Sequence, residues 1–248
     1  MRRKIMERLK KWRNAKNRLP LLLYGARQVG KTYILREFGR SCFENTVYVN
    51  FEEDKALAGY LEVKLTPAYI IKVIEEQYGV KIYPQKTLII FDEIQSCEHA
   101  LTSLKYFAEQ APEYCVVAAG SLLGVAINRQ QFSFPVGKVQ LENLYPLDLE
   151  EYLWARDKDM LVDLIRQCYA TNKPLPETLH KEALNLYEDY LLTGGMPAVV
   201  AAALNDGNAD ELKRLIYNSY VADMAKYAGK GDSVKIAEAY DSLPVQLA

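Results

Sequence analysis

The chain has 248 residues, half of them hydrophobic and a quarter of them charged, which is ordinary for a globular protein. Its 31 basic and 32 acidic side chains nearly cancel, so the net charge predicts no bulk attraction to nucleic acid or to a membrane. The four cysteines form no CxxC pair and the chain has only two histidines, which excludes a zinc motif or a disulfide framework and fits a reducing compartment.

Residues 1–18 are the first predicted element, a basic amphipathic helix. They contain nine lysines and arginines but a single acid, Glu7. Ile5, Leu9 and Trp12 recur at helical spacing, which would let them pack against a core while the charges stay in water. Alternatively, residues 2–18 would bind the phosphates of a nucleic acid. The sequence leaves both alternatives open.

Strand and helix signals alternate between residues 19 and 153. The predicted strands are residues 19–24, 46–51, 87–93, 114–121 and 137–144. The predicted helices are residues 31–38, which we expect to stop at Gly39, and residues 66–79 and 101–110. Continuous apolar strands separated by helices indicate a parallel sheet with helices on both faces. We therefore expect an α/β domain at 19–153.

Beyond this domain the sequence has helical spacing and no strand signal. The predicted helical segments are residues 148–172, 176–195 and 209–229. Gly194 and Gly195 would form either a hinge between helices or a helix cap followed by a turn. We expect a small all-helical domain at 154–248.

The eight residues GARQVGKT, 25–32, lie between the first core strand and the first core helix. They match the pattern GxxxxGK followed by Ser or Thr, whose backbone N–H groups surround nucleotide phosphates at a helix N-terminus. Gly25 would permit a sharp exit from the strand, and Gly30 would let the backbone approach a phosphate. Lys31 would reach the β- and γ-phosphates and Thr32 would ligate Mg²⁺. The residues predicted to bind the phosphates are Gly25, Ala26, Arg27, Gln28, Val29, Gly30, Lys31 and Thr32.

Two acids, Asp92 and Glu93, follow the apolar run at 88–91. They would stand at the carboxyl end of a strand, where α/β sheets bind ligands. Asp92 is predicted to hold Mg²⁺ together with Thr32, and Glu93 to orient and deprotonate the water that attacks the γ-phosphate. A small-molecule kinase has less need of such an acid, so Glu93 favours hydrolysis.

Ser121 ends the apolar strand at 114–121. Its hydroxyl would stand between the two motifs, near the γ-phosphate or the attacking water. The alternative is a simple Gly-Ser turn that closes the strand.

GARQVGKT, FDEIQ and AAGS, in this order, resemble the AAA+-type P-loop ATPases of bacteria and archaea that share a G-x-R-Q-x-G-K-T loop and carry a C-terminal domain of unknown function. The resemblance extends through VYVNFE, PVGKV, LYPLDLEEYL and YLLTGGMP, and so covers most of the chain. It implies a RecA-like (ASCE) sheet with the strand before the loop in the centre, the strands of Asp92 and Ser121 beside it, and a small helical lid.

The resemblance also implies the activity and its residues. ATP would be hydrolysed with Mg²⁺, and the catalytic residues would be Lys31, Glu93 and Ser121, with Ser121 as the sensor of the γ-phosphate. Lys138 stands in PVGKV where many relatives have arginine. A lysine finger offers a point charge in place of a planar fork, so turnover would be slow or need an arginine from a partner. A structural lysine on an edge strand is the alternative.

Relatives of this type continue with a further domain, so we expect that the helical lid is truncated and that the chain is a fragment. The leading functional expectation is an Mg²⁺-dependent ATPase that moves its helical part, acting on a nucleic acid or a protein partner. The alternative, which Lys138 favours, is an ATP-gated switch or scaffold with little turnover. A third reading is a small-molecule kinase. The partner and the oligomeric state, a homo-oligomer included, are left open.

The sequence also bears on location. The longest apolar stretch, 116–127, is well short of the roughly 20 residues that a membrane-spanning helix needs. The first residues lack the apolar core of a signal peptide. We therefore expect a cytoplasmic protein that does not enter a membrane.

Overall fold

The computed structural model describes residues 1–121, 135, 137–205, 207–227 and 233–247. The chain falls into two compact units, Met1–Pro146 and Leu147–Ala248. The position predicted for the domain boundary, between residues 153 and 154, lies within α7 (Leu149–Ala155), the first helix of the second unit.

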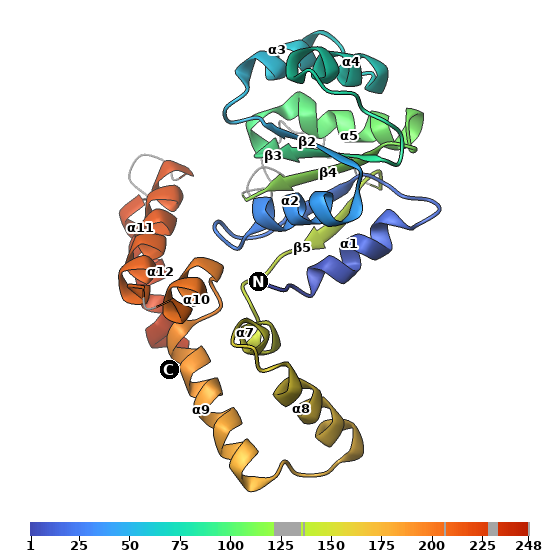
Figure 1. Cartoon of the computed structure of the whole chain (residues 1–248). Helices are drawn as coiled ribbons and strands as arrows, with labels where there is room; N and C mark the ends of the chain where they lie inside the picture. The colour runs from blue at the N-terminus through green and yellow to red at the C-terminus, as the bar shows by residue number, and fades with distance from the viewer. Residues whose placement is uncertain (122–134, 136, 206, 228–232, 248) are drawn as a thin grey trace. The chain divides into compact units, whose positions relative to one another are not determined.

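A five-stranded parallel sheet forms the middle of the first unit (Figure 1). Its strands are β1 (Leu21–Tyr24), β2 (Asn45–Asn50), β3 (Thr87–Asp92), β4 (Cys115–Gly120) and β5 (Gln140–Asn143). The spatial order is β2-β3-β4-β1-β5, and each neighbouring pair is parallel. This confirms the expected RecA-like sheet. It also corrects the expected order in two respects, because the central strand is β4 and not β1, and because β4 separates the Asp92 strand, β3, from β1.

Helices cover both faces of this sheet. In Figure 1, α1 (Ile5–Arg13) and α2 (Lys31–Cys42) lie on one face. The opposite face carries α3 (Lys55–Val63), α4 (Pro67–Tyr78) and α5 (Glu98–Gln110), with the short 3-10 helix η1 (Ile94–Ser96) before α5. β3 and β4 are buried at every position, because helices cover both faces of the sheet. The sequence patterns predict no helix at α3, which Asp54 caps by accepting from the Leu57 N–H at 2.8 Å.

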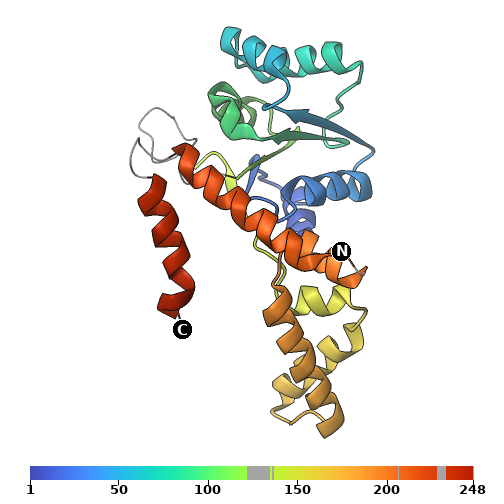
Figure 2. The ribbon, with the colours of Figure 1, turned by 90° about the vertical axis from the view of Figure 1, so that its left-hand side faces the viewer.

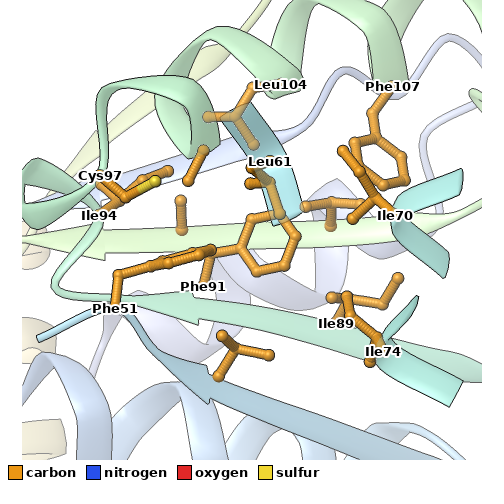
Figure 3. Close-up of a cluster of buried hydrophobic side chains, with 14 of the residues drawn as sticks. Phe51, Leu61, Ile70, Ile74, Ile89, Phe91, Ile94, Cys97, Leu104 and Phe107 are labelled. Carbon is orange, nitrogen blue, oxygen red and sulfur yellow. The ribbon is translucent and has the colours of Figure 1, made fainter. Parts of the chain in front are cut away.

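The core between the sheet and α3, α4 and α5 is rich in aromatic and branched side chains (Figure 3). The ring of Phe91 on β3 contacts the rings of Phe51 and Phe107, whose centroids lie 5.4 and 6.3 Å away. Full burial of a large apolar side chain contributes about 1.5–3 kcal/mol to stability. This cluster therefore fixes the strand that ends at Asp92.

The basic segment at the N-terminus packs through its apolar face, as one of the two alternatives requires. Ile5, Leu9 and Trp12 are buried. The Trp12 ring meets the Phe38 ring of α2 edge-on, at 6.2 Å between centroids, and its indole N–H donates to the Leu19 carbonyl at 2.7 Å. The helix α1 is thus part of the core of the first unit.

The prediction that α2 stops at Gly39 is wrong, because the helix continues to Cys42. Gly39 is needed for a different reason. A Cβ atom at this position would overlap the Oγ1 of Thr46 on β2 and lie 2.8 Å from its Cγ2. The glycine therefore marks the place where α2 approaches β2 closely, which the local sequence pattern does not reveal.

The described residues of the second unit form helices joined by short loops, with no strand among them. Its helices are α7 (Leu149–Ala155), α8 (Asp159–Thr171), α9 (Glu177–Thr193), α10 (Pro197–Leu204), α11 (Ala209–Tyr227) and α12 (Ser233–Leu247). The single helix expected at 148–172 is interrupted at Asp157, whose backbone is left-handed with φ 57°. Two long helices drawn in orange and red in Figure 2, α11 and α12, meet through the stacked rings of Tyr217 and Tyr240.

The two glycines after α9 form a cap and a turn. Gly194 caps the helix with φ 76°. Gly195 lies against Leu147, where a Cβ atom would overlap the Leu147 carbonyl oxygen, and its own carbonyl accepts from the Leu147 N–H at 2.7 Å. Of the two readings of this glycine pair, the cap with a turn describes the structure.

Among the residues that the structure describes, none of the helices combines the length and the apolar composition required to cross a lipid bilayer.

Candidate functional site

The loop between β1 and α2 has the backbone of an anion-binding nest. Gln28 and Gly30 are left-handed, with φ of 63° and 92°. Such residues turn neighbouring backbone N–H groups toward one concave side, where an anion can accept from several of them. Because the capping residue of α2 is Gly30, no side chain of the cap occupies the first N–H groups of the helix, where the helix dipole favours negative charge.

Gly25 is required by the strand beside the loop. Its Cβ position would overlap the carbonyl oxygen of Leu144, directly after β5, while the Leu144 N–H donates to the Tyr24 carbonyl at 2.8 Å. The loop can therefore leave β1 alongside the end of β5 only if residue 25 lacks a side chain. Steric room beside β5 is thus a second reason for this glycine, in addition to the exit turn that the motif predicts.

Lys31, the first residue of α2, folds back across the loop. Its Nζ donates to the carbonyls of Gly25 and Ala26 at 2.9 and 2.8 Å, and the residue is only 7% exposed. Burial lowers the pKa of Lys31 below its ordinary value of 10.5, against the opposing effect of the Glu93 and Asp92 carboxylates. The ammonium is therefore held close to the concave side of the loop with acceptors that an anion could replace.

The hydroxyl of Thr32 donates to Oδ2 of Asp92 at 2.6 Å. Asp92, at the end of β3, is 2% exposed. The two residues that the sequence predicts as a metal-binding pair are thus in direct contact. They are 60 positions apart in the sequence, and the fold of the sheet brings them together.

Tyr48 on β2 is a third member of this cluster. Its hydroxyl donates to the same Oδ2 of Asp92 at 2.8 Å, and the guanidinium of Arg36 lies 3.8 Å from the centroid of its ring. Burial and the hydrogen bond to Asp92 raise the pKa of Tyr48 to about 12, so the hydroxyl stays protonated at neutral pH. The alternating pattern of residues 46–51 predicts the strand but not the role of Tyr48, because no local signal says which neighbour a strand residue faces.

Glu93 follows Asp92 with a left-handed backbone, φ 48°. Its N–H donates to Oδ1 of Asp92 at 2.9 Å, which links the two acids. The side-chain amide of Gln95 donates to Oε2 of Glu93 and so restrains the carboxylate that the sequence assigns to catalysis. Gln95 belongs to FDEIQ, but the sequence pattern alone predicts no role for it.

Ser121 lines a cavity over the ends of β1 and β5. The cavity has a volume of about 310 Å³ and is lined by Tyr24, Gly25, Ala26, Ser121, Asn143, Leu144, Tyr145 and Pro146. The Ser121 Oγ is buried, and among the described residues it has no hydrogen-bond partner. Because β4 pairs with β1 in register Gly120 to Tyr24, the serine comes directly beside the start of the loop. A buried hydroxyl in this state can donate to a ligand.

A family model described as "AAA domain" matches residues 17–153, which is more than half of the chain. The chain belongs to this AAA domain family. A second model, described as a domain of unknown function, matches residues 184–248.

One curated protein and two solved structures that are similar to this chain are at most 26% identical to it. The uncharacterized protein MJ1637 of Methanocaldococcus jannaschii is 26% identical in an alignment of 209 residues that covers 80% of this chain and 40% of that protein. The chain therefore spans about two fifths of the length of this curated relative. The Walker-type ATPase paby2304 of Pyrococcus abyssi has a TM-score of 0.49 and 14% identity, with 98% of this chain and 76% of that chain covered. AMPPCP-bound DnaA from Aquifex aeolicus has a TM-score of 0.42 and 13% identity, with 96% and 64% covered.

Lys138 of this AAA domain lies away from the loop. Its Nζ pairs with Glu109 at the end of α5, at 3.0 Å. The residue precedes β5, and since all five strands are parallel, the beginning of β5 is at the edge of the sheet opposite the end of β1. Lys138 therefore does not serve as a finger for the loop of its own first unit, and the structural alternative fits.

The residues of the AAA domain also fit a magnesium ion. Within the described ranges, no group of three or more His, Cys, Asp and Glu side chains could hold a metal ion. Mg²⁺ needs no such cluster, because in nucleotide sites it takes one or two protein oxygens and completes its shell with water and phosphate oxygens. The Thr32 hydroxyl and the Asp92 carboxylate are such a donor set.

Proposed function

We propose that this AAA domain binds Mg²⁺–ATP in the loop 25–32 and hydrolyses it to ADP and phosphate. The family and the parallel sheet support nucleotide binding. The observation that carries the proposal is the contact between Thr32 and Asp92, at 2.6 Å, next to an anion-binding loop. One hydroxyl and one buried carboxylate at this position have the chemistry to hold the metal of a metal–triphosphate.

The loop and Lys31 would bind the phosphates. The N–H groups of residues 28–32 would donate to the β-phosphate. Because the capping residue, Gly30, has no side chain, it does not compete with the phosphate for these N–H groups. Lys31 would exchange the carbonyls of Gly25 and Ala26 for phosphate oxygens, a stronger partner for a buried ammonium. This exchange would also close the loop around the triphosphate.

The acids and Ser121 would carry out hydrolysis. Bound Mg²⁺ would neutralise charge on the β- and γ-phosphates. Glu93 would accept a proton from water as the water oxygen bonds to the γ-phosphorus and the bond to the ADP oxygen breaks. Ser121, whose hydroxyl is buried beside the loop, would donate to the γ-phosphate.

Phosphate release from ATP by the purified chain tests this proposal. Glu93→Gln should still bind ATP but turn it over at least about 100-fold more slowly, because a general base contributes about 10²–10⁴ in rate. Glu98→Gln, which removes an exposed acid at the start of α5, is the matched control and should hydrolyse ATP as the unaltered chain does. Equal hydrolysis by the Glu93 variant would reject Glu93 as the base.

A second candidate function is an ATP-gated switch with little turnover. It is favoured by the contact of Gln95 with Glu93, which occupies the base, and by the position of Lys138 away from the loop. Single-turnover kinetics separate the two functions. Bound ATP that survives for hours would support the switch, and rapid conversion to ADP would support the ATPase.

We extend the proposal to a conformational change of the helical residues after Pro146 and to action on a nucleic acid or a protein partner. Sizing of the chain with and without a non-hydrolysable ATP analogue and DNA tests this extension. A nucleotide-dependent change in size would support self-association or partner binding. An unchanged size in every combination of analogue and DNA would contradict this extension and leave the proposed hydrolysis of ATP untouched.

A further inference from the structure

The basic N-terminal segment reaches the loop through Arg3. This side chain is 6% exposed. Its Nη1 donates to the carbonyl of Val29 in the loop at 3.0 Å, and its Nη2 donates to the carbonyl of Tyr145 at 2.6 Å. A buried guanidinium is rare unless its donors are used, and its rigid fork suits two acceptors held at fixed positions.

The place of Arg3 is fixed by the helix that follows it. The helix α1 is held in the core by Ile5, Leu9 and Trp12, and Arg8 pairs with Glu142 of β5 at 3.3 Å. The Arg3 carbonyl accepts from the Met6 N–H at 3.2 Å, which joins it to the first turn. The guanidinium is therefore delivered to the loop by a docked element and not by a loose terminus.

The contact with Val29 acts on the anion-binding side of the loop. The Val29 carbonyl and the Gly30 N–H belong to one peptide group, and in a trans peptide these two groups point in opposite directions. A cation that holds the carbonyl from behind therefore sets the plane of the peptide and directs the N–H to the other side. It also polarises the peptide, which makes the N–H a stronger donor.

We propose that Arg3 is a positioning residue for phosphate binding, acting through the peptide between Val29 and Gly30. This inference rests on the proposed function, because it requires that the loop bind ATP. Through Tyr145, Arg3 also ties the loop to the residues that follow β5. One basic residue of the N-terminal segment thus serves the nucleotide from behind the loop and is not available to nucleic-acid phosphates.

Calorimetric titration of the full chain with Mg²⁺–ATP tests the inference. In Arg3→Ala the dissociation constant should rise by about tenfold or more, since a hydrogen bond made by a charged group is worth about that factor. Lys11→Ala removes a charge from an exposed side chain of the same segment and should bind ATP as the unaltered chain does. Millimolar guanidinium should restore ATP binding to Arg3→Ala by filling the vacated site, whereas urea at the same concentration should not.

The melting temperature without nucleotide separates positioning from folding. Arg3→Lys keeps the charge but loses the fork, and it is the variant to use if Arg3→Ala does not fold. We expect weaker ATP binding with a melting temperature close to that of the unaltered chain. Unchanged ATP affinity in the folded Arg3 variants would overturn the inference about Arg3 but not the proposed function. The same holds for a loss of ATP affinity in Arg3→Ala that guanidinium does not reverse. Failure of the unaltered chain to bind ATP would overturn the proposed function as well.

Discussion

The close approach of α2 to β2 at Gly39 lends itself to a quantitative test. A Cβ atom in Gly39→Ala would overlap Thr46 Oγ1 and lie 2.8 Å from Cγ2 and 3.2 Å from Cβ of the same residue. Overpacking of this kind costs about 1–3 kcal/mol, while alanine is favoured over glycine in a helix by about 1 kcal/mol. The free energy of unfolding should therefore fall by about 0–2 kcal/mol.

Two further variants make the test decisive. In the Thr46→Ala background the overlapping Oγ1 and Cγ2 atoms are gone and only the contact with Cβ at 3.2 Å remains, so adding Gly39→Ala should be less destabilising than in the unaltered chain and should at best stabilise by up to about 1 kcal/mol. Gly59→Ala in α3, where a Cβ atom would meet nothing within 4 Å, should give the same gain alone. Urea denaturation followed by circular dichroism measures all of these values. If Gly39→Ala stabilises the chain as much as Gly59→Ala does, the close approach is refuted.

Two other predictions concern the site. Tyr48→Phe removes one of the two hydrogen-bond donors to Asp92 Oδ2 and should weaken Mg²⁺ binding about tenfold, the lower end of the range for the loss of a group that orients a metal ligand. Titration with Mn²⁺ followed by electron spin resonance measures the metal affinity, and Tyr33→Phe, at an exposed tyrosine, is the control. Equal metal affinities in the two variants would contradict this prediction. Because the pKa of Lys31 is lowered in the folded chain, the unfolded chain binds more protons between that pKa and 10.5, so stability relative to Lys31→Met should rise with pH in that window. Denaturation at a series of pH values would show a flat or falling difference if this reasoning is wrong.

The sequence predicts the sheet well because the sheet is specified locally. β4 and the centre of β3, residues 88–91, are apolar runs of strand length, which is the pattern typical of a strand covered on both faces. The strand order cannot be obtained in this way, and β3 is accordingly one position further from β1 than expected. A glycine can also be mistaken for a helix end when its cause is a distant contact, because Gly39 faces Thr46 of β2 within a helix that continues to Cys42.

The residues of the candidate site also differ in whether a local sequence pattern predicts them. The contact of Thr32 with Asp92 lies within motifs whose spacing encodes the chemistry, although the roles of these residues in catalysis remain predictions. Tyr48, Gln95 and Arg3 contact the same motifs through side chains that carry no pattern of their own. Such residues become visible only when the fold brings them to the motif.

The family pattern begins at residue 17, but the Arg3 side chain lies against the Val29 carbonyl. A recombinant piece trimmed to 17–153 would retain every motif residue named here and discard the support beneath one of its peptides, together with the Trp12 ring that covers Phe38. Boundaries drawn from recurring motifs can therefore be narrower than the piece of polypeptide that has to be expressed to study them.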